Sequence, residues 1–409
     1  MNNNFNELKF TNSFKKLETW IFKNERYGYD PYDFIGSNWT KYFFGENSKS
    51  WIRIKIRKAF KGLGDRYPKI LRKIFFIKKT INPKGLGLIA NAYLLNYERT
   101  QDDQYLAKAE DILKWLSKNY SNEFKGKSWG YPFNWYSRIY IPKYTPSSVV
   151  TGTISDAYFK HYNLTKSSES KEILDNIYLF FRSELKRFTN NKGDICFSYT
   201  PIDDFRVHNA SLFTAAFLSK YYILTNKNES KELAISALNY VLNEQKADGS
   251  FCYWSEEPES IIDHFHTGYV LRHIHTISEA IKVDVSKYLK RGLKFYVENL
   301  YDSEGLPKFS KELEFPKDAH GLAESVLSLI QLYELCNELK SKEFTNRLLI
   351  KSLEFISDNM QTTEGYVVWQ IRENKRKIDF PFHRWCQAWT YLAYSKFRLE
   401  YENRNVITY

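Results

Sequence analysis

The sequence lacks the features that identify a secreted, membrane-spanning or disulfide-stabilised protein. Its four cysteines, Cys196, Cys252, Cys336 and Cys386, stand singly, and none forms a CxxC pair. We therefore expect reduced thiols, as in a cytoplasmic protein. Residues 1–10 are polar and lack the apolar segment of a signal peptide. No run of about 18 apolar residues occurs, so we expect no membrane-spanning helix.

The chain is also poor in glycine and proline, with 17 and 11 in 409 residues, which argues against an all-β or loop-rich fold. It contains no P-loop, GxGxxG, GxSxG or HExxH motif, so the commonest nucleotide-binding, serine hydrolase and zinc protease signatures are absent. Aromatic residues are abundant instead, at 17%. They predict either an ordinary large core or a cavity lined by rings, which suits sugars and apolar ligands.

One structural unit recurs six times. It consists of a Gly-containing turn, a few polar and aromatic residues, a helix rich in small and apolar residues, and an amphipathic helix. The first helices should start near Asn82, Pro146, His208, Asp263, Asp318 and Phe382, at spacings of 64, 62, 55, 55 and 64 residues. Such units cannot bury their apolar faces alone and therefore stack. We predict an all-α fold, an (α/α)6 toroid of six helical hairpins over residues 81–409.

The two helices of each unit differ in polarity. The second helices have apolar residues at i, i+3, i+4 and i+7 with charged residues between them, which indicates one wet face. The first helices carry less charge and should form an inner ring. The outer ring should contain residues 104–120, 171–188, 231–245, 285–300 and 342–360. Residues 1–80 should supply an outer helix or a separate arm, in which 51–57 alternates like a strand and 66–79 resembles a basic helix.

The starts of the inner helices should meet at one end of the ring. Their unpaired N–H groups and partial positive charge favour an anionic ligand. A structural hydrogen bond is the simplest role for any one histidine, and capping accounts for Asp263, Asp318 and Asn209. Five of the eight histidines nevertheless fall at these starts, which predicts that one or more act in catalysis. They are His208, His264, His266, His320 and His383.

Other residue types near the same starts are candidate site residues. Tyr131 and Asp263 are added to the histidines as catalytic candidates. The candidate substrate-binding residues are Trp129, Trp135, Tyr136, Arg138, Asp204, Asn209, Trp254, Asp318, Trp369, Arg384 and Trp385. His264 and His266 with Asp263 or Cys252 offer zinc ligands, but no tight four-ligand spacing exists. We therefore predict no metal and no cofactor.

Several motifs resemble those of one protein group. They are YDPYDF at 29–34, NPKGLGL at 82–88, WGYPFNW at 129–135, SYTP at 198–201 with VHNA at 207–210, DGSFCYW at 248–254 and IDHFHTG at 262–268. Together they resemble toroid proteins of exopolysaccharide and capsule biosynthesis, the VpsJ-like group. Its fold is similar to that of the six-hairpin glycosidase superfamily, which includes hydrolases, uronate lyases, and glucuronyl and N-acylglucosamine epimerases. The resemblance implies a glycan or sugar-containing substrate, without a particular reaction. Asn134 stands where an acidic residue would serve as a general acid.

The first hypothesis is an enzyme that moves a proton at a sugar carbon, by epimerisation or β-elimination, on a uronic acid-containing glycan. His264 or His266 would be the base, and Tyr131 or Tyr136 would supply the proton from the other face. Arg138 and Arg384 would hold the carboxylate. Sugar rings would stack on Trp129, Trp135, Trp254 and Trp369. Hydrolysis would instead need two carboxylates from Asp203, Asp204, Asp263 and Asp318.

Two other hypotheses remain. The chain could be a glycan-binding or scaffold protein of a polysaccharide assembly system, in which the aromatic residues matter and the histidines do not. A terpenoid-type cyclase or prenyltransferase would require a dry apolar cavity, and the charges at the helix starts argue against it. The DxDD motif of such cyclases is absent, because Pro201 and Ile202 precede Asp203 and Asp204.

The positive charge is concentrated in one segment. The formal net charge is +12, and residues 51–79 contain 11 Lys and Arg but only one acid, Asp65. Such a segment can be an ordinary solvated helix face, or it can contact a membrane surface or a partner. We do not expect nucleic acid as the partner.

Overall fold

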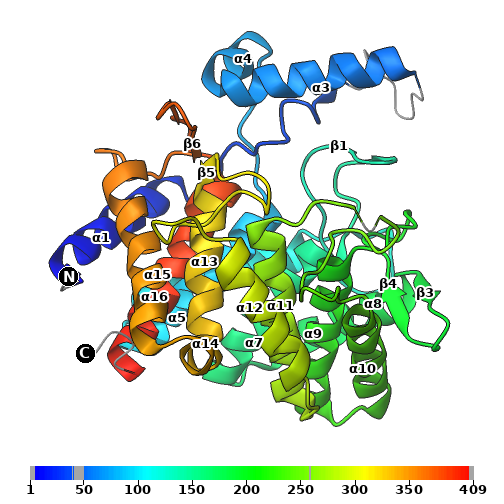
Figure 1. Ribbon diagram of the computed structural model, residues 1–409. Helices are drawn as coiled ribbons and strands as arrows, with labels where there is room; N and C mark the ends of the chain where they lie inside the picture. Colours follow the sequence, from blue (N-terminus) through cyan, green and yellow to red (C-terminus); the bar gives the residue numbers. More distant parts are fainter. Residues whose placement is uncertain (1–4, 39, 41–49, 258, 405–409) are drawn as a thin grey trace.

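The computed structural model describes residues 5–38, 40, 50–257 and 259–404. Its inner helices form a closed ring, since each packs against the next and the last packs against the first (Figure 1). The ring confirms the predicted all-α toroid. Its members are α5 (Pro83–Thr100), α7 (Ser148–Thr165), α9 (His208–Thr225), α11 (His264–Ile281), α13 (Ala319–Gln331) and η2 with α16 (His383–Ala388 and Trp389–Arg404).

A second layer of helices covers the ring. Its members are α6 (Asp103–Lys118), α8 (Ser168–Ser183), α10 (Asn228–Asn243), α12 (Ser286–Asn299), α14 (Tyr333–Leu339) and α15 (Lys342–Phe355) with η1 (Ile356–Met360). From the start of the chain, α1 (Glu7–Asn24) packs against α16 and η1. The helix expected at 171–188 ends earlier, at Ser183, because Arg187–Thr189 pairs as β3 with β4 (Ile195–Phe197).

The ends of the inner helices follow from local chemistry. The Asn82 side chain accepts hydrogen bonds from the backbone N–H groups of Lys84 and Gly85, and Asp263 caps α11 in the same way. The helices α5, α7, α9 and α11 each end at a residue with a left-handed backbone. Close approach between neighbours depends on small residues. A Cβ on Gly268 would lie 2.7 Å from the hydroxyl oxygen of Ser328, so α11 and α13 could not pack as closely.

Short strands hold the loops that precede the inner helices. The hairpin of β1 (Trp135–Tyr136) and β2 (Tyr140–Ile141) precedes α7. A three-stranded antiparallel sheet, in the order β5-β6-β7, joins the loop before α13 to the loop before η2. Its strands are β5 (Lys317–Asp318), β6 (Gln370–Ile371) and β7 (Lys377–Ile378), with Asp318 opposite Gln370.

Residues 50–79 form an arm that lies over the end of the ring where the inner helices begin (Figure 1). The strand expected at 51–57 was wrong, because this segment belongs to the helix α3 (Trp51–Arg66). The basic helix expected at 66–79 is present in part, as α4 (Pro68–Ile74). Arg72 fixes the arm through a buried ion pair with Asp33, 2.6 Å long. The division of the chain at residue 80 stays a prediction.

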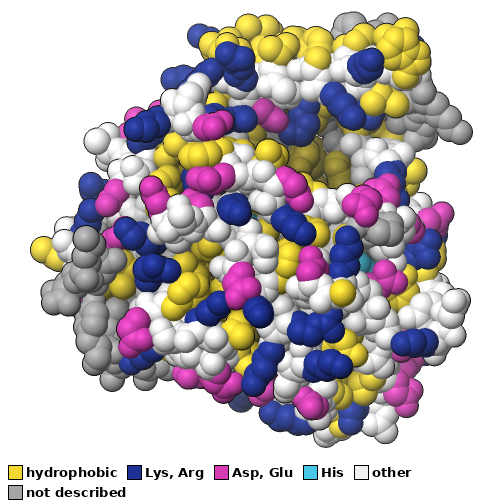
Figure 2. Space-filling model, viewed as in Figure 1, with side chains coloured by type: hydrophobic (Ala, Val, Ile, Leu, Met, Phe, Trp, Pro, Cys, Tyr) yellow, Lys and Arg dark blue, Asp and Glu magenta, His cyan; other side chains and the backbone are white. Residues whose placement is uncertain are grey.

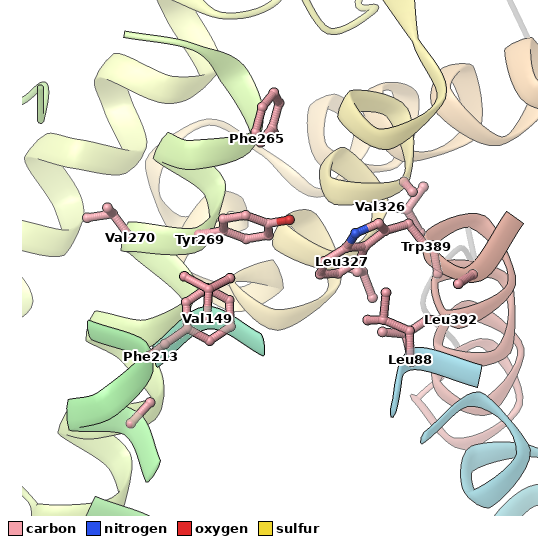
Figure 3. Close-up of a cluster of buried hydrophobic side chains, with 14 of the residues drawn as sticks. Leu88, Val149, Phe213, Phe265, Tyr269, Val270, Val326, Leu327, Trp389 and Leu392 are labelled. Atoms are coloured by element: carbon pink, nitrogen blue, oxygen red, sulfur yellow. The ribbon is translucent and has the colours of Figure 1, made fainter. Parts of the chain in front are cut away.

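Side chains of the inner helices project toward the middle of the ring (Figure 3). On the side of the helix starts, Val149, Phe265 and Tyr269 line one cavity. On the other side, Phe213 and Trp389 line a second cavity. The ring therefore has two separate ends rather than an open channel. We call them the mouth, where the inner helices start, and the far end.

Candidate active site

The mouth contains a small cavity to which all six inner helices contribute residues from their first turns. Its volume is about 120 Å³. Rings dominate the wall, and no Asp or Glu is among its lining residues. These are Tyr32, Lys84, Tyr131, Phe133, Trp135, Val149, Tyr199, Asn209, Tyr253, Phe265, His266, Tyr269, His320, Arg384 and Trp385.

His266 is the imidazole that faces this cavity with a carboxylate behind it. Asp263 caps α11 by accepting from the backbone N–H of His266 at 2.8 Å, and its other oxygen lies 2.6 Å from the Nδ1 of the same residue. A carboxylate in this position holds the proton on Nδ1, so Nε2 is free to accept a proton from a bound molecule. The His266 ring also packs against Tyr253, with 4.5 Å between ring centroids.

His320 is the second imidazole of the cavity, and it is held differently. Its ring lies between the rings of Phe265 and Trp389, at centroid distances of 4.6 and 4.9 Å. Its Nε2 is hydrogen-bonded to the Tyr269 hydroxyl, and Nδ1 has no partner among the described residues. Burial lowers the pKa of His320 well below its usual value, so the ring stays neutral at neutral pH.

Lys84 lies at the floor of the cavity, where sequence analysis did not place a functional residue. Its side chain is 3% exposed, and its ammonium lies 5.3 Å from the ring centroid of Trp389 and 5.8 Å from that of Tyr269. Burial lowers the pKa of Lys84 well below that of an ordinary lysine. The available signal was a lysine within the first turn of an inner helix otherwise made of small and apolar residues.

Arg384 lines the cavity but is already paired. Its guanidinium donates two hydrogen bonds to Asp30, at 2.6 and 2.9 Å, and both side chains are buried. Its flat face lies against Tyr131 and Trp385, 5.1 and 5.0 Å from their ring centroids. The expected role of Arg384, bidentate binding of a substrate carboxylate, is therefore performed on a carboxylate of the protein itself.

Asp318 acts on the cavity indirectly. It caps α13, accepts a hydrogen bond from the Trp385 indole at 3.0 Å and another from the Gln370 amide at 2.8 Å. Burial raises its pKa. The carboxyl group thus fixes the ring of Trp385 in the cavity wall instead of facing the cavity itself.

Three of the predicted catalytic histidines do not reach the cavity. His264 packs against Tyr296, 4.6 Å between centroids, and burial lowers its pKa to about 3. Burial likewise lowers the pKa of His208 and of His383 to about 4. His208 is hydrogen-bonded to a backbone carbonyl, at 2.7 Å. His264 and His266 diverge because each residue of a helix turns by about 100°, so two residues apart point in nearly opposite directions.

Most of the predicted carbohydrate-stacking tryptophans lie elsewhere. Trp135 and Trp385 line the cavity, as does Asn209. Trp129 is buried and donates to the carbonyl of Leu116 at 3.1 Å. Two more rings are covered by protein. The Arg138 guanidinium lies 3.8 Å from the Trp254 ring centroid, and Trp369 packs against Phe382 at 5.0 Å.

The remaining polar candidates also have structural partners. Arg138 pairs with Glu256 at 2.9 Å and Glu257 at 2.5 Å, and Asp204 pairs with Lys186 at 2.7 Å on the surface. Tyr136 packs against Tyr140 outside the lining set. None of these side chains lines the cavity.

The other carboxylate and the asparagine flagged from the sequence serve the backbone. Asp203 accepts from the backbone N–H groups of Thr200 and Phe205, at 2.7 and 2.9 Å. Asn134 donates to the carbonyl of Gly36 at 3.0 Å and accepts from the N–H of Lys143. No two of the four candidate carboxylates therefore face each other across the cavity. Among the described residues, no three His, Cys, Asp or Glu side chains lie close enough together to bind a metal ion.

Comparisons with family models and with curated proteins gave no match. Solved structures with the same fold include cellobiose 2-epimerase from Bacillus thermoamylovorans B4167, with a TM-score of 0.61 and 12% identity over 78% of this chain and 88% of that one. A D-mannose isomerase gives 0.59 and 13% over 78% and 87%. An unsaturated glucuronyl hydrolase specific for heparin gives 0.60 and 13% over 98% of both chains.

These neighbours belong to the six-hairpin glycosidase superfamily, and at such identities the likeness establishes the fold alone. The resemblance to the VpsJ-like group stays a prediction.

Proposed function

We propose that this protein is a carbohydrate-active enzyme that transfers a proton at a carbon atom of a sugar, by epimerisation or isomerisation. The observation that carries the proposal is His266, oriented by Asp263 and facing a ring-lined cavity with no carboxylate in its wall. An imidazole held in this way, with Nε2 open to the cavity, suits proton abstraction. The cellobiose 2-epimerase and the D-mannose isomerase among the structural neighbours support the same class of reaction.

The residues of the cavity can be assigned to the steps of such a reaction. Nε2 of His266 would take the proton from the carbon next to the carbonyl group of an open-chain sugar. The electrons of that C–H bond move to the carbonyl oxygen, which becomes negatively charged. Burial raises the pKa of Tyr131, so its hydroxyl keeps its proton and can donate to this oxygen. Return of a proton to the former carbonyl carbon completes an isomerisation, and its return to the opposite face of the original carbon completes an epimerisation.

The cavity also limits the substrate. A volume of about 120 Å³ corresponds to the liquid volume of roughly four water molecules, so the cavity limits the reacting part of the substrate to about one sugar unit at most. The expected binding of a uronic acid loses its main support, because Arg138 and Arg384 already pair with carboxylates of the protein. Hydrolysis is disfavoured because it needs two carboxylates beside the sugar. A biosynthetic role in exopolysaccharide or capsule formation and a cytoplasmic location stay predictions from the sequence.

The test is incubation of the protein in D₂O with a panel of reducing sugars, N-acetylhexosamines and uronic acids, followed by proton NMR and mass spectrometry. We expect deuterium at the carbon next to the carbonyl group of at least one sugar. The His266→Asn variant should lose this exchange, whereas His264→Asn, two residues away but outside the cavity, should retain it. Cleaved products without deuterium would contradict the proposal and favour hydrolysis. Binding without any chemical change would contradict it in favour of a glycan-binding protein.

A further inference from the structure

The arm over the mouth turns an apolar face away from the protein. On α3, Ile52, Ile56, Ala59 and Leu63 follow the helical spacing i, i+4, i+7 and i+11, and all four side chains are exposed. We call these four residues the apolar stripe. In a helix that packs on a soluble protein, such a stripe faces the core. Here it faces outward, so packing within the chain does not explain it.

The second part of the arm continues the same feature. Ile70 and Ile74 of α4 are each 57% exposed, and Phe76 in the turn that follows is 87% exposed. Trp51 at the start of α3 is 65% exposed. Figure 2 shows hydrophobic side chains along the edge of the arm that faces away from the ring, with Lys and Arg side chains among them. Exposed apolar surface of this extent marks a site of interaction.

Positively charged side chains border this apolar surface. Exposed lysines and arginines accompany the apolar residues on both helices of the arm: Arg53, Lys55, Lys58 and Arg66 on α3, and Lys69 and Lys73 on α4. Within the described part of the arm, Lys61 pairs with Asp65 and Arg72 with Asp33, while these six pair with no carboxylate. A surface complementary to this arm would therefore have an apolar layer to receive the stripe and negative charge to meet the flanking cations.

The opposite face of α3 holds the arm to the ring. Gly64 packs directly on the phenyl group of Phe34, and a Cβ on Gly64 would lie 2.5 Å from that group. The ammonium of Lys61 lies over Tyr32, a residue of the mouth cavity, at 5.2 Å from the ring centroid. The Arg376 side chain donates to the carbonyl of Arg66 at 3.2 Å. The outward direction of the stripe is thus fixed relative to the mouth.

We propose that the arm docks the protein on a lipid bilayer that contains anionic lipids. The 16 residues of α3 would lie along the bilayer surface over about 24 Å. The stripe would enter the boundary between headgroups and acyl chains, and the flanking cations would contact lipid phosphates. Within the described residues, none of the helices is both long and apolar enough to cross a membrane. The inference does not depend on the proposed reaction.

Vesicle flotation tests the proposal on the full chain. We expect binding to vesicles of phosphatidylcholine mixed with phosphatidylglycerol, no binding to phosphatidylcholine alone, and release by salt. Two arm variants should each bind about tenfold more weakly or worse. One replaces apolar residues, Ile52→Asn, Ile56→Asn, Ile70→Asn and Phe76→Asn. The other replaces cations, Arg53→Gln, Lys55→Gln, Lys58→Gln and Lys69→Gln.

Matched controls carry the same numbers of substitutions at exposed positions away from the arm. The apolar control is Leu8→Asn, Leu179→Asn, Ile223→Asn and Leu313→Asn. The charge control is Lys118→Gln, Lys125→Gln, Lys287→Gln and Lys294→Gln. Both should bind vesicles like the unmodified protein, and circular dichroism should show that every variant is folded. Absence of binding to anionic vesicles, or full binding by both arm variants, would overturn the proposal. So would a dimer in light scattering that both arm variants abolish while vesicle binding is unchanged.

Discussion

The two ends of the ring have similar numbers of ionisable groups, but they differ in how these groups are paired with carboxylates. At the far end, a cavity of about 310 Å³ is lined by Lys160, Lys220, Arg272 and Lys396, and each of these forms an ion pair with a carboxylate. At the mouth, Lys84 and His320 have no carboxylate partner among the described residues. His266 has one, but it is placed to hold a single tautomer.

This difference distinguishes charged residues that stabilise the fold from residues that are available for a reaction. Each cation of the far end pairs with a carboxylate, so these residues fit a structural role. Helix starts repel cations, so a lysine held there within aromatic rings is costly and needs another explanation. The far end thus serves as an internal reference, with similar residue types but no proposed chemistry.

The largest difference between the two ends should appear when one histidine is replaced at each end in turn. His266→Asn removes the proposed base and should lower kcat/KM about 10²–10⁴-fold. His273→Asn, in the wall of the far cavity, should leave it within a few-fold. Steady-state kinetics on the sugar found by deuterium exchange measures both. Equal losses in two folded variants would remove the distinction between the ends.

The second comparison concerns two arginine–carboxylate pairs, one at each end of the ring. Arg384→Met leaves Asp30 without its partner, and Arg272→Met does the same to Glu324, a carboxylate that is 0% exposed. Each change should lower the free energy of unfolding by about 3–5 kcal/mol, because a buried charge is left unpaired. Urea titration measures this loss. Only Arg384→Met should also change the KM for the sugar, and a change in KM for Arg272→Met would contradict the assignment.

Acid should not distinguish the two ends. The folded-state pKa of His264 is lowered to about 3, and that of His273 is also lowered by burial. Below the ordinary histidine pKa of about 6.5, the unfolded chain binds a proton that the folded chain does not, so stability is lost as the pH falls from there. For His264 the loss between about pH 6.5 and 4.5 should be roughly 2–3 kcal/mol. Urea unfolding of His264→Asn should show a flatter dependence on pH, and an unchanged slope would contradict it.

The smallest difference should appear in the pH dependence of stability when one lysine is replaced at each end in turn. The pKa of Lys84 is lowered in the folded state, so the unfolded chain binds more protons and stability rises with pH up to the ordinary lysine value. Lys84→Met should remove part of this rise between about pH 7 and 9.5. Lys220→Met, which breaks only a partly exposed ion pair, should keep the rise and cost about 0–1 kcal/mol. Thermal unfolding across this range would contradict the assignment if both curves were parallel.

The fold was predictable because its signals are local. Asn82, Asp263 and Asp318 are side chains that cap helices, and each does so within a residue of the predicted start. The error at 51–57 has the same origin. Alternating apolar and basic residues also produce one helical stripe, and only the continuation through Ala59 and Leu63 distinguishes the two patterns.

The site was only partly predictable, since the direction of a side chain depends on packing between helices. The sequence located Asp263 and both neighbouring histidines but not which imidazole faces inward. That choice depends on Tyr296, which fills the space beside His264. The partner of Arg384 was equally hidden, because Asp30 is more than 350 residues away along the chain.

The two ends of the chain meet where α1 packs against α16. Phe10, Phe14, Leu17 and Ile21 of α1 are buried, and Phe10 packs against Phe397, 5.0 Å between centroids. The described termini lie side by side (Figure 1). During synthesis, α1 emerges from the ribosome first and its partner α16 last. The apolar face of α1 therefore stays uncovered until nearly the whole chain has been made, and it is exposed to chaperones and to other nascent chains during that time. A circular permutant that joins these ends and opens an outer loop would shorten the time for which this face is uncovered.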